Sequence, residues 1–270
     1  MTAPQPGAHR PRKRFGQNFL HDPGIIRRIV DAIDPQAAQA VAEIGPGLGA
    51  LTCPLLERLG HLDVIELDRD VIPRLLAHCG NLGSLRIHEA DALAFDFNAL
   101  AAERGQALRV VGNLPYNISS PLLFHLFAQV GSLRDMTFML QKEVVDRLAA
   151  QPGSRDYGRL SVMAQVICRI DALFTVPPGA FNPLPKVDSA IVRLTPHPEP
   201  LVDKATHESL ARVVRAAFGQ RRKTLRNTLK GIVPADTMDS VGIDPTRRPE
   251  TLSLDEFILL ARQVVDRAAD

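Results

Sequence analysis

Short apolar segments alternate with segments of helical periodicity from residue 41 to residue 140, and this alternation constrains the fold more than any other feature. Strands are predicted at 41–44, 62–67, 85–88, 108–112 and 136–140, with helices at 51–59, 71–78 and 121–130. This spacing is typical of a parallel, doubly wound sheet that is covered by helices on both faces. Two more strands, at 167–176 and 190–194, complete a predicted α/β fold with a mostly parallel, seven-stranded sheet.

The segments outside this alternation divide the 270-residue chain into three predicted parts. Residues 1–14 are polar and basic without apolar periodicity, which predicts a flexible basic arm. An α/β domain is expected over 15–199, and its first helix should have Asp22 as N-cap and Pro23 at the first position. A Pro-rich linker at 196–200 then leads to a small helical domain over 200–270.

A glycine-rich turn separates the first predicted strand from the helix that follows it, with the sequence Gly45-Pro46-Gly47-Leu48-Gly49. Such a turn lets the backbone approach a ligand closely. The spacing differs from the G-x-G-x-x-G of dinucleotide-binding folds. Taken alone, the turn is therefore as compatible with a purely structural role as with ligand binding.

Polar residues stand at the carboxyl ends of the next three predicted strands. Glu66 ends the second strand, about twenty residues beyond the glycine-rich turn, where an acidic residue typically accepts hydrogen bonds from ribose hydroxyls. Asp91 follows the third strand, where a carboxylate can accept from an adenine amino group, and Asn113 follows the fourth. Because open α/β sheets bind ligands at this edge, the series indicates a nucleoside-bearing cofactor better than three solvated loop residues.

The sequence Asn113-Leu114-Pro115-Tyr116 offers two hydrogen-bond acceptors and an aromatic ring. Asn113 has a side-chain carbonyl, and Pro115 restricts Leu114 to extended geometry, which can turn the Leu114 carbonyl outward. The Tyr116 ring can stack on a nucleobase. These groups suit an exocyclic amine, although an ordinary turn after a strand uses the same residue types. Beside a nucleoside-bearing cofactor, they favour methyl transfer from S-adenosylmethionine over hydride transfer with NAD.

Charge and cysteine content favour a cytoplasmic protein with a polyanionic partner. The net charge is +2, but eight Lys and Arg against one Glu fall within 204–230. Cys53, Cys79 and Cys168 lie far apart, which predicts small core residues rather than a disulfide framework or a zinc site. With no apolar run of transmembrane length and no secretory segment, we expect no membrane association and a reducing, cytoplasmic location.

Seven motifs, in this order, carry a specific resemblance that covers residues 12–265. They are GQNFL (16–20), EIGPGLG (43–49), NLPYNISSP (113–121), LQKE (140–143), YGRLS (157–161), FNPLPKVDS (181–189) and QRRKTLRN (220–227). With them the chain closely resembles the KsgA-type (RsmA) 16S ribosomal RNA adenine dimethyltransferases, a branch of the rRNA adenine N6-methyltransferase superfamily. Pro249 departs from the family pattern, which is expected to have a smaller residue there, and this puts only the local helix geometry in question.

The resemblance implies a Rossmann-like class I methyltransferase domain over 15–199 and an RNA- and ribosome-binding role for 200–270. It implies S-adenosylmethionine as the cofactor and two adjacent N6,N6-dimethyladenines near the 3′ end of 16S rRNA as the product, formed in assembling 30S subunits during small-subunit biogenesis. The cofactor contacts that it implies map onto Asn18, Leu20, Gly45, Gly47, Glu66, Asp91 and Asn113. Without the resemblance, Asn18 and Leu20 would be interpreted as a structural lead-in to the first helix.

The expected chemistry is mainly one of positioning. Adenine N6 is a poor nucleophile because its lone pair is delocalised into the ring, so the site has to orient it toward an already electrophilic methyl group. Asn113 and the Leu114 carbonyl are expected to accept the N6 hydrogens, and Tyr116 to stack on a base extruded from its helix. Phe181 is expected to form a second stacking wall, because it lies in a Pro-rich loop beside the sheet. No carboxylate is needed as general base, since the proton leaves readily once the nitrogen is alkylated.

RNA binding should be mainly electrostatic. Together with the basic arm, the candidates for phosphate contacts are Arg221, Arg222, Lys223, Arg226 and Lys230. Their spacing at 222, 226 and 230 predicts one face of a helix, for which a solvated surface is the alternative interpretation. The eight histidines show no metal-ligand spacing, so we expect no metal site, and we expect a monomer.

Three other functions remain open from the sequence. An Erm-like large-subunit rRNA methyltransferase would have the same pocket chemistry, and the 204–270 region is what distinguishes it. A mainly non-catalytic ribosome-assembly factor would keep the fold and the RNA-binding surface. An NAD-dependent oxidoreductase is disfavoured by the glycine spacing and by the acceptors that Asn113 and Leu114 offer.

Overall fold

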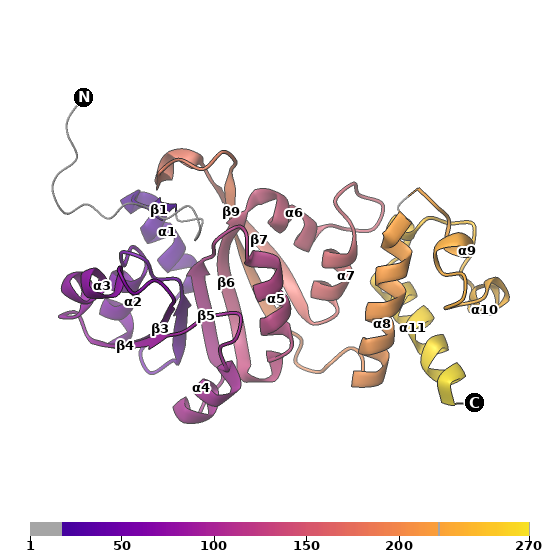
Figure 1. Ribbon diagram of the computed structural model, residues 1–270, viewed down its shortest axis with the longest axis horizontal. Helices are drawn as coiled ribbons and strands as arrows, with labels where there is room; N and C mark the ends of the chain where they lie inside the picture. The colour runs from indigo at the N-terminus through magenta and orange to yellow at the C-terminus, as the bar shows by residue number, and fades with distance from the viewer. Residues whose placement is uncertain (1–17, 221, 270) are drawn as a thin grey trace. The chain divides into compact units, whose positions relative to one another are not determined.

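The computed structural model describes residues 18–220 and 222–269 (Figure 1). The predicted basic arm at 1–14, the beginning of the GQNFL motif and Arg221 lie outside the described residues. The chain forms two compact units, one of residues up to 142 with 171–195 and the other of residues 143–170 with the chain from 196 on. Residues 143–170, which the sequence analysis includes in the 15–199 domain, therefore belong to the helical unit.

A seven-stranded sheet is the centre of the first unit, and its strand order is β4-β3-β2-β5-β6-β9-β7. The pairs from β4 to β6 are parallel, whereas β9 is antiparallel to β6. The strands are β2 (Val41–Ile44), β3 (His61–Glu66), β4 (Ser84–Glu89), β5 (Leu108–Asn113), β6 (Leu133–Gln141), β7 (Cys168–Val176) and β9 (Ser189–Pro196). The predicted mostly parallel, seven-stranded α/β sheet is confirmed.

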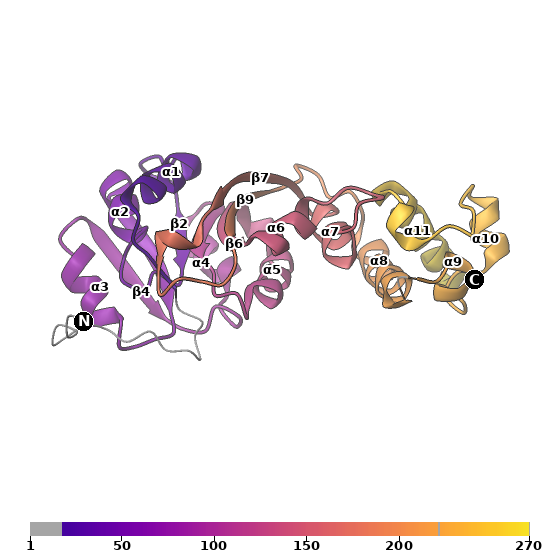
Figure 2. The same ribbon diagram turned by 90° about the horizontal axis from the view of Figure 1, so that it is seen from above.

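Helices cover both faces of this sheet, as the spacing of the sequence predicts. They are α1 (Pro23–Ile33), α2 (Thr52–Leu59), α3 (Ile72–Cys79), α4 (Phe97–Arg104) and α5 (Ser119–Phe127). Figure 2 shows α1 and α2 on one side of the sheet and α5 on the other. The apolar periodicity of α4 is too weak to have been recognised in the sequence; its N-terminus is capped by Asp96, whose carboxylate accepts from the Ala99 N–H (2.9 Å).

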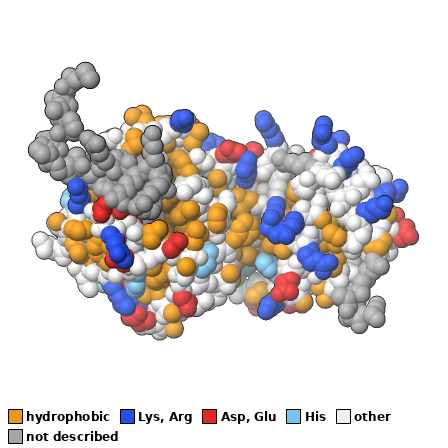
Figure 3. Space-filling view, in the orientation of Figure 1, with side chains coloured by type: hydrophobic (Ala, Val, Ile, Leu, Met, Phe, Trp, Pro, Cys, Tyr) orange, Lys and Arg blue, Asp and Glu red, His pale blue; other side chains and the backbone are white. Residues whose placement is uncertain are grey.

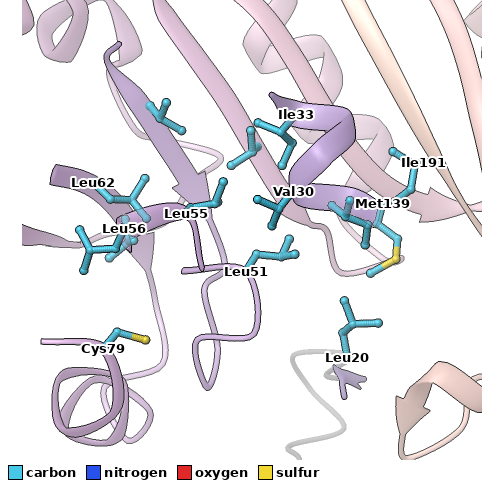
Figure 4. Close-up of a cluster of buried hydrophobic side chains, with 14 of the residues drawn as sticks. Leu20, Val30, Ile33, Leu51, Leu55, Leu56, Leu62, Cys79, Met139 and Ile191 are labelled. Carbon is cyan, nitrogen blue, oxygen red and sulfur yellow. The ribbon is translucent and has the colours of Figure 1, made fainter. Parts of the chain in front are cut away.

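The core beneath α1 and α2 comes from residues with helical and strand periodicity (Figure 4). Ile29, Val30 and Ile33 face it from α1, and Leu55 and Leu56 face it from α2, all with exposed fractions of 2% or less. Each buried side chain of this size contributes roughly 1.5–3 kcal/mol by leaving water. The core therefore fixes the helix that begins directly after the glycine-rich turn against the sheet.

The start of α1 follows the sequence prediction. Asp22 accepts hydrogen bonds from the backbone N–H of Gly24 (2.8 Å) and Ile25 (3.0 Å), and Pro23 occupies the first helical turn. Immediately before it, β1 (Phe19–Leu20) pairs antiparallel with β8 (Phe181–Asn182) in a separate two-stranded sheet. This pairing brings together segments that are about 160 residues apart in the sequence.

The second unit is built from helices. They are α6 (Lys142–Ala149), α7 (Arg159–Gln165), α8 (Lys204–Ala217), α9 (Leu225–Thr228), α10 (Ala235–Ser240) and α11 (Leu254–Ala269). Helix α8 packs on α7 and along α11. Phe218 makes ring contacts with Tyr157 (6.1 Å between centroids) and Phe257 (5.6 Å), and these aromatic contacts help to explain why 143–170 belongs with the C-terminal helices. Pro249 is buried and opens a short 3-10 turn, Pro249–Thr251.

Two local predictions were wrong. Cys53 on α2 and Cys79 at the end of α3 form a disulfide, with 5.0 Å between their Cα atoms, whereas Cys168 is a buried free thiol as expected. Sequence spacing did not reveal this pair because 26 residues and a strand separate its members. The predicted helical face at 222, 226 and 230 does not exist either, because α9 covers Leu225–Thr228 alone. No helix in the described part of the chain is long and apolar enough to cross a membrane.

Candidate functional site

A cavity of about 860 Å³ lies at the carboxyl edge of the sheet, entirely within the first unit. This volume is in the range of small-molecule sites. Its walls include every residue that the sequence analysis assigns to the cofactor: Asn18, Leu20, Gly45, Gly47, Glu66, Asp91 and Asn113. They also include the whole tetrad from Asn113 to Tyr116. The structure thus joins into one site the strand-end residues and the acceptor-bearing turn that the sequence analysis identified separately.

The glycine-rich turn lines the cavity, and its glycines have a left-handed backbone conformation that other residues adopt rarely. Gly45, Gly47 and Gly49 all have positive φ angles, of 68°, 55° and 92°. The Gly45 N–H donates to the Ile65 carbonyl (2.9 Å), which ties the turn to the end of β3. A Cβ at Gly49 would lie 2.6 Å from the Cys79 Sγ, so this position also lacks room for a side chain. Gly49 is therefore required by close packing, while Gly45 and Gly47 line the cavity.

Glu66 is held in a fixed orientation at the end of β3. Its Oε2 accepts from the Gly47 N–H (3.3 Å) and its Oε1 from the Asp68 N–H (2.8 Å), and the residue is 8% exposed. Burial raises the pKa of this carboxyl, although the backbone N–H donors oppose the rise. A vicinal diol that donated two more hydrogen bonds would further stabilise the charged form. Glu66 is therefore suited to bind ribose hydroxyls, as the sequence indicates.

Asp91 and Asn113 both line the cavity, Asp91 after β4 and Asn113 at the end of β5, and β3 and β2 lie between these two strands in the sheet. Asp91 is exposed and accepts from the Leu93 N–H (2.9 Å), which orients its carboxylate at the mouth of the cavity. Asn113 is the last residue of β5, and its side-chain Nδ2 donates to the Asn18 carbonyl (3.2 Å). Because the amide nitrogen is turned toward Asn18, the amide oxygen points the other way. Asn113 therefore presents an acceptor on the side away from Asn18.

The backbone after Asn113 is fixed by the neighbouring strand. The Leu114 N–H donates to the Met139 carbonyl of β6 (3.1 Å), and Leu114 is buried at 1% exposure. Pro115 follows and lines the cavity with Leu114 and Tyr116. The Tyr116 hydroxyl shares a hydrogen bond with the Ser189 Oγ (2.7 Å). Tyr116 is half-buried at the wall of the cavity.

Gly112 explains how β5 approaches its neighbour at this point. A Cβ at Gly112 would lie 2.4 Å from the Ile44 carbonyl oxygen. A larger residue would force β5 away from the end of β2, where the glycine-rich turn begins. Gly112 therefore keeps the acceptors of the tetrad close to the cofactor end of the cavity.

Phe181 is not placed as the sequence analysis expects. It belongs to β8, is 1% exposed and packs in the core cluster with Leu20 and Ile191, and it does not line the cavity. Its neighbour Asn182 does line the cavity. Side chains alternate across a strand, so the pairing of Phe181 with Leu20 turns the ring inward. Its role as a stacking wall stays a prediction that requires the ring to move.

Glu43, Arg74 and His78 are among the cavity residues that were not predicted as site residues from the sequence. Glu43 is 2% exposed, and the Thr52 Oγ1 donates to its Oε2 (2.7 Å). Burial is the main reason that its pKa rises to about 8. Arg74 and His78 are one helical turn apart on α3 and border the cavity from the exposed side. Glu43 could have been found from its place two residues before Gly45 of the glycine-rich turn, whereas Arg74 and His78 have no such signature.

The hydrogen-bond acceptors and apolar walls of the cavity fit the nucleoside part of S-adenosylmethionine. Glu66 can accept from the ribose diol, and Asp91 can accept from the adenine amino group. Ile65, Leu67 and Ala92 provide apolar walls on which an adenine ring can lie. Among the described residues there is no group of three His, Cys, Asp or Glu that could hold a metal ion. The site thus fits a nucleoside-bearing cofactor by its own chemistry.

The basic residues predicted to contact RNA lie in the second unit. Arg222, Lys223, Arg226 and Lys230 are all exposed, but they lie in and around the short helix α9 rather than on one continuous helix. On the face shown in Figure 3, many Lys and Arg side chains lie over the C-terminal helices. The structure describes four of the five predicted residues, and Arg221 is the fifth.

Comparison with known proteins gives a consistent result across the whole chain. The sequence model of the family described as ribosomal RNA adenine dimethylase matches residues 8–265. The ribosomal RNA small subunit methyltransferase A of Nitrosococcus oceani is 59% identical over 254 residues, which cover 94% of this chain and 96% of that protein. The protein of the same name from Chromohalobacter salexigens is 57% identical over 267 residues, covering 98% and 95%.

Two solved structures share the fold of this chain over most of its length. A dimethyladenosine transferase from Plasmodium falciparum has a TM-score of 0.81 at 26% identity and covers 93% of this chain and 98% of its own. The 23S rRNA methyltransferase ErmE has a TM-score of 0.73 at 24% identity, with 92% and 99% covered, and this likeness shows the fold alone. The predicted class I methyltransferase fold is confirmed.

Proposed function

The chain belongs to the ribosomal RNA adenine dimethylase family, and we propose which adenines it modifies and how its residues do so. It is an S-adenosylmethionine-dependent rRNA adenine dimethyltransferase. The proposed product is a pair of adjacent N6,N6-dimethyladenosines near the 3′ end of 16S rRNA, formed in assembling 30S subunits as a step of small-subunit biogenesis. The relatives at 54–59% identity that are named small subunit methyltransferases support this target.

Each predicted cofactor residue would contact a different part of S-adenosylmethionine. When bound, S-adenosylmethionine supplies an electrophilic methyl group on a sulfonium. Glu66 would hold the ribose hydroxyls and Asp91 the adenine amino group. The backbone at Gly45 and Gly47 approaches the ligand closely because neither residue carries a side chain. Asn18 and Leu20 close the cavity from β1 and the residue before it.

The orientation of the Asn113 amide is the observation that carries the proposal. The Asn113 Nδ2 donates to the Asn18 carbonyl, so its oxygen is the atom that can accept from a substrate amine. With the Leu114 carbonyl as second acceptor, the two hydrogens of adenine N6 would each have a partner. Those hydrogen bonds draw the nitrogen toward a pyramidal form and aim its lone pair at the methyl group.

Tyr116 supplies the remaining positioning. Its ring lines the cavity directly after the two acceptors and would stack on the adenine, which has to leave its helix to reach this depth. Stacking fixes the plane of the base, while the acceptors fix its rotation within that plane. The N6 proton needs no dedicated carboxylate base, because the alkylated nitrogen loses it readily to solvent.

The C-terminal unit would provide the electrostatic part of RNA binding. Arg222, Lys223, Arg226 and Lys230 are exposed cations that can contact phosphates, and from the sequence we propose Arg221 as a further phosphate contact. We further propose that the enzyme acts as a cytoplasmic monomer on the 30S particle. An Erm-like large-subunit activity is the less favoured alternative, because ErmE is 24% identical whereas the small-subunit relatives reach 59%.

The test is mass spectrometry of nucleosides from both ribosomal subunits of a deletion strain, complemented with either the parent protein or Asn113→Ala. We expect N6,N6-dimethyladenosine to be missing from 16S rRNA of the deletion strain and to be restored by the parent. Asn113→Ala should not restore normal dimethylation. As a purified enzyme it should retain less than about 1% of the parent rate, since loss of a transition-state hydrogen bond costs 10²–10³ in rate.

A matched control is Asn98→Ala, because Asn98 is an exposed asparagine of the same unit that does not line the cavity. It should restore normal dimethylation. Loss of the modification from 23S rRNA instead of 16S rRNA would reject the proposed target. Normal dimethylation by Asn113→Ala would reject the proposed role of that side chain.

A further inference from the structure

We propose that Ser189 is a positioning residue that holds the Tyr116 ring for catalysis, and that this anchor matters most for the second methyl transfer. The inference rests on the proposed function, in which Tyr116 stacks on the target adenine. Ser189 does not line the cavity and therefore touches neither cofactor nor substrate. It would act through Tyr116 alone.

The contact itself is short and shielded from water. The Tyr116 hydroxyl and the Ser189 Oγ are 2.7 Å apart, and either atom can donate. Ser189 is fully buried, with an exposed fraction of 0%. A hydrogen bond in such a place has little competition from solvent, and loss of one partner leaves the other unsatisfied. The bond thus holds the far end of the ring with a well-defined geometry.

One strand supports both the anchor and the acceptors. Ser189 is the first residue of β9 and pairs with Gln141 of β6. Two residues earlier on β6, Met139 pairs with Asn113, and its carbonyl accepts from the Leu114 N–H. The ring and the two acceptors are therefore positioned relative to the same rigid element. This arrangement fixes the stacking plane relative to the groups that orient N6.

The backbone of Tyr116 is also held by a hydrogen bond. The Ser119 hydroxyl, at the start of α5, donates to the Tyr116 carbonyl (3.1 Å). With its backbone held by Ser119 and its hydroxyl held by Ser189, the ring has little freedom to change rotamer. Removal of the Ser189 hydroxyl would release the end of the ring that is furthest from the backbone.

The second methyl transfer should depend more strongly on stacking by the Tyr116 ring than the first methyl transfer does. Unmodified adenine N6 has two hydrogens, one for Asn113 and one for the Leu114 carbonyl. After the first methylation the nitrogen keeps one hydrogen, so one of the two acceptors loses its partner. Stacking on Tyr116 then provides a larger share of the orientation. A loosened ring should therefore slow the second step more than the first.

The experiment is a double-mutant cycle of Tyr116→Phe and Ser189→Ala, followed by nucleoside mass spectrometry over time with undermethylated 30S subunits. Each single variant should slow the second transfer by roughly 3- to 10-fold, the value of one neutral hydrogen bond, and should accumulate N6-methyladenosine. The double variant should be no slower than either single variant, because both remove the same bond. Additive effects, or an unchanged ratio of mono- to dimethyladenosine, would overturn the inference.

Two further variants separate this inference from the proposed function. Ser161→Ala also removes a fully buried serine hydroxyl, one that donates to the Arg147 carbonyl in the helical unit, and it should leave the product ratio unchanged. If Ser189→Ala does not fold, Tyr116→Phe alone tests the product ratio. Full activity of Tyr116→Ala would reject the stacking role itself, whereas an inactive Tyr116→Ala with a normal Ser189→Ala would reject only the anchor.

Discussion

Glu43 is a carboxyl group enclosed between the end of β2 and the first turn of α2. The Thr52 hydroxyl donates to it, and Glu66 adds a second negative group nearby. Burial is the largest cause of its pKa rising from 4.5 to about 8, and the hydrogen bond from Thr52 only partly opposes this. The folded protein therefore binds a proton at Glu43 over a range of pH in which the unfolded chain has lost it.

Because of this difference, Glu43 should make the protein less stable as the pH rises from about 4.5 to about 8. Below that window both states are protonated, and above it both are ionised, so the contribution changes only inside it. Glu43→Gln removes the titration and keeps an oxygen for Thr52. Relative to the parent, its free energy of unfolding should rise across the window by up to about 1.4 kcal/mol per pH unit.

Urea unfolding at several pH values between about 4 and 9 measures this effect. Glu57→Gln is the matched control, since Glu57 is an exposed residue of the same helix α2. Its unfolding free energy should run parallel to that of the parent. A Glu43→Gln curve that is also parallel to the parent would contradict the assignment of a protonated Glu43 to the folded state.

At the scale of the elements, Arg109 joins a helix to two strands. It is a residue of β5 with 6% exposure, and its Nε lies 3.0 Å from the Asp135 carboxylate of β6. Its guanidinium also donates to the Ile33 carbonyl (2.6 Å) and the Asp34 carbonyl (3.0 Å) at the end of α1. A cation at this place satisfies carbonyls that the helix leaves unpaired and interacts favourably with the helix dipole.

Arg109→Ala should lower the free energy of unfolding by about 3–5 kcal/mol, because it leaves a largely buried carboxylate and two helix-end carbonyls without their donor. Arg134→Ala is the control, since Arg134 is an exposed residue next to Asp135 on β6, and it should change stability by less than about 0.5 kcal/mol. Chemical unfolding of the three proteins provides the comparison. A decrease of less than about 1 kcal/mol in Arg109→Ala would show that this link between α1 and the sheet is weak.

The pairing of β1 with β8 is the element-scale feature that completes the site. Leu20 pairs with Phe181, and Phe19 pairs with Asn182. Leu20 and Asn182 line the cavity, and Asn18, directly before β1, accepts the hydrogen bond from Asn113. The N-terminal residues of the site are thus held by a strand pair rather than by a free loop.

At the scale of the whole molecule, the residues proposed to contact RNA and the cavity proposed to hold the cofactor belong to different units. The exposed residues Arg222, Lys223, Arg226 and Lys230 are in the helical unit, and the cavity is in the α/β unit. Phosphate contacts release counterions, so they contribute affinity that decreases as salt increases. Substrate affinity and catalytic rate should therefore be separable by mutation.

The double variant Arg222→Gln/Arg226→Gln should bind undermethylated 30S subunits more weakly and with a shallower dependence of log K on log salt. The slope should fall by roughly 0.7–0.9 for each phosphate that the variant no longer neutralises, while kcat at saturating 30S stays near that of the parent. Binding titrations at several salt concentrations measure this. Arg58→Gln is the control, because Arg58 already pairs with Asp31 (2.6 Å). An unchanged slope in the double variant would exclude Arg222 and Arg226 as phosphate ligands.

The alternation of apolar segments was sufficient to predict the seven-stranded sheet, because burial on both faces of a parallel sheet leaves a direct trace in the sequence. The same reasoning placed Glu66, Asp91 and Asn113 at one edge, since parallel strands end on the same side. Capping chemistry at Asp22 and Pro23 was equally local and was confirmed. The family and its cofactor followed from motifs that the chain carries in order.

Contacts between distant residues were decided by the tertiary structure alone. Asn18 and Asn113 are 95 residues apart, and Tyr116 and Ser189 are 73 apart, so no local pattern records either hydrogen bond. The Cys53–Cys79 disulfide and the inward turn of Phe181 depend in the same way on which elements become neighbours. Periodicity tells which face of a segment is buried, but the partner of each side chain depends on strand register and on how the connecting loops fold.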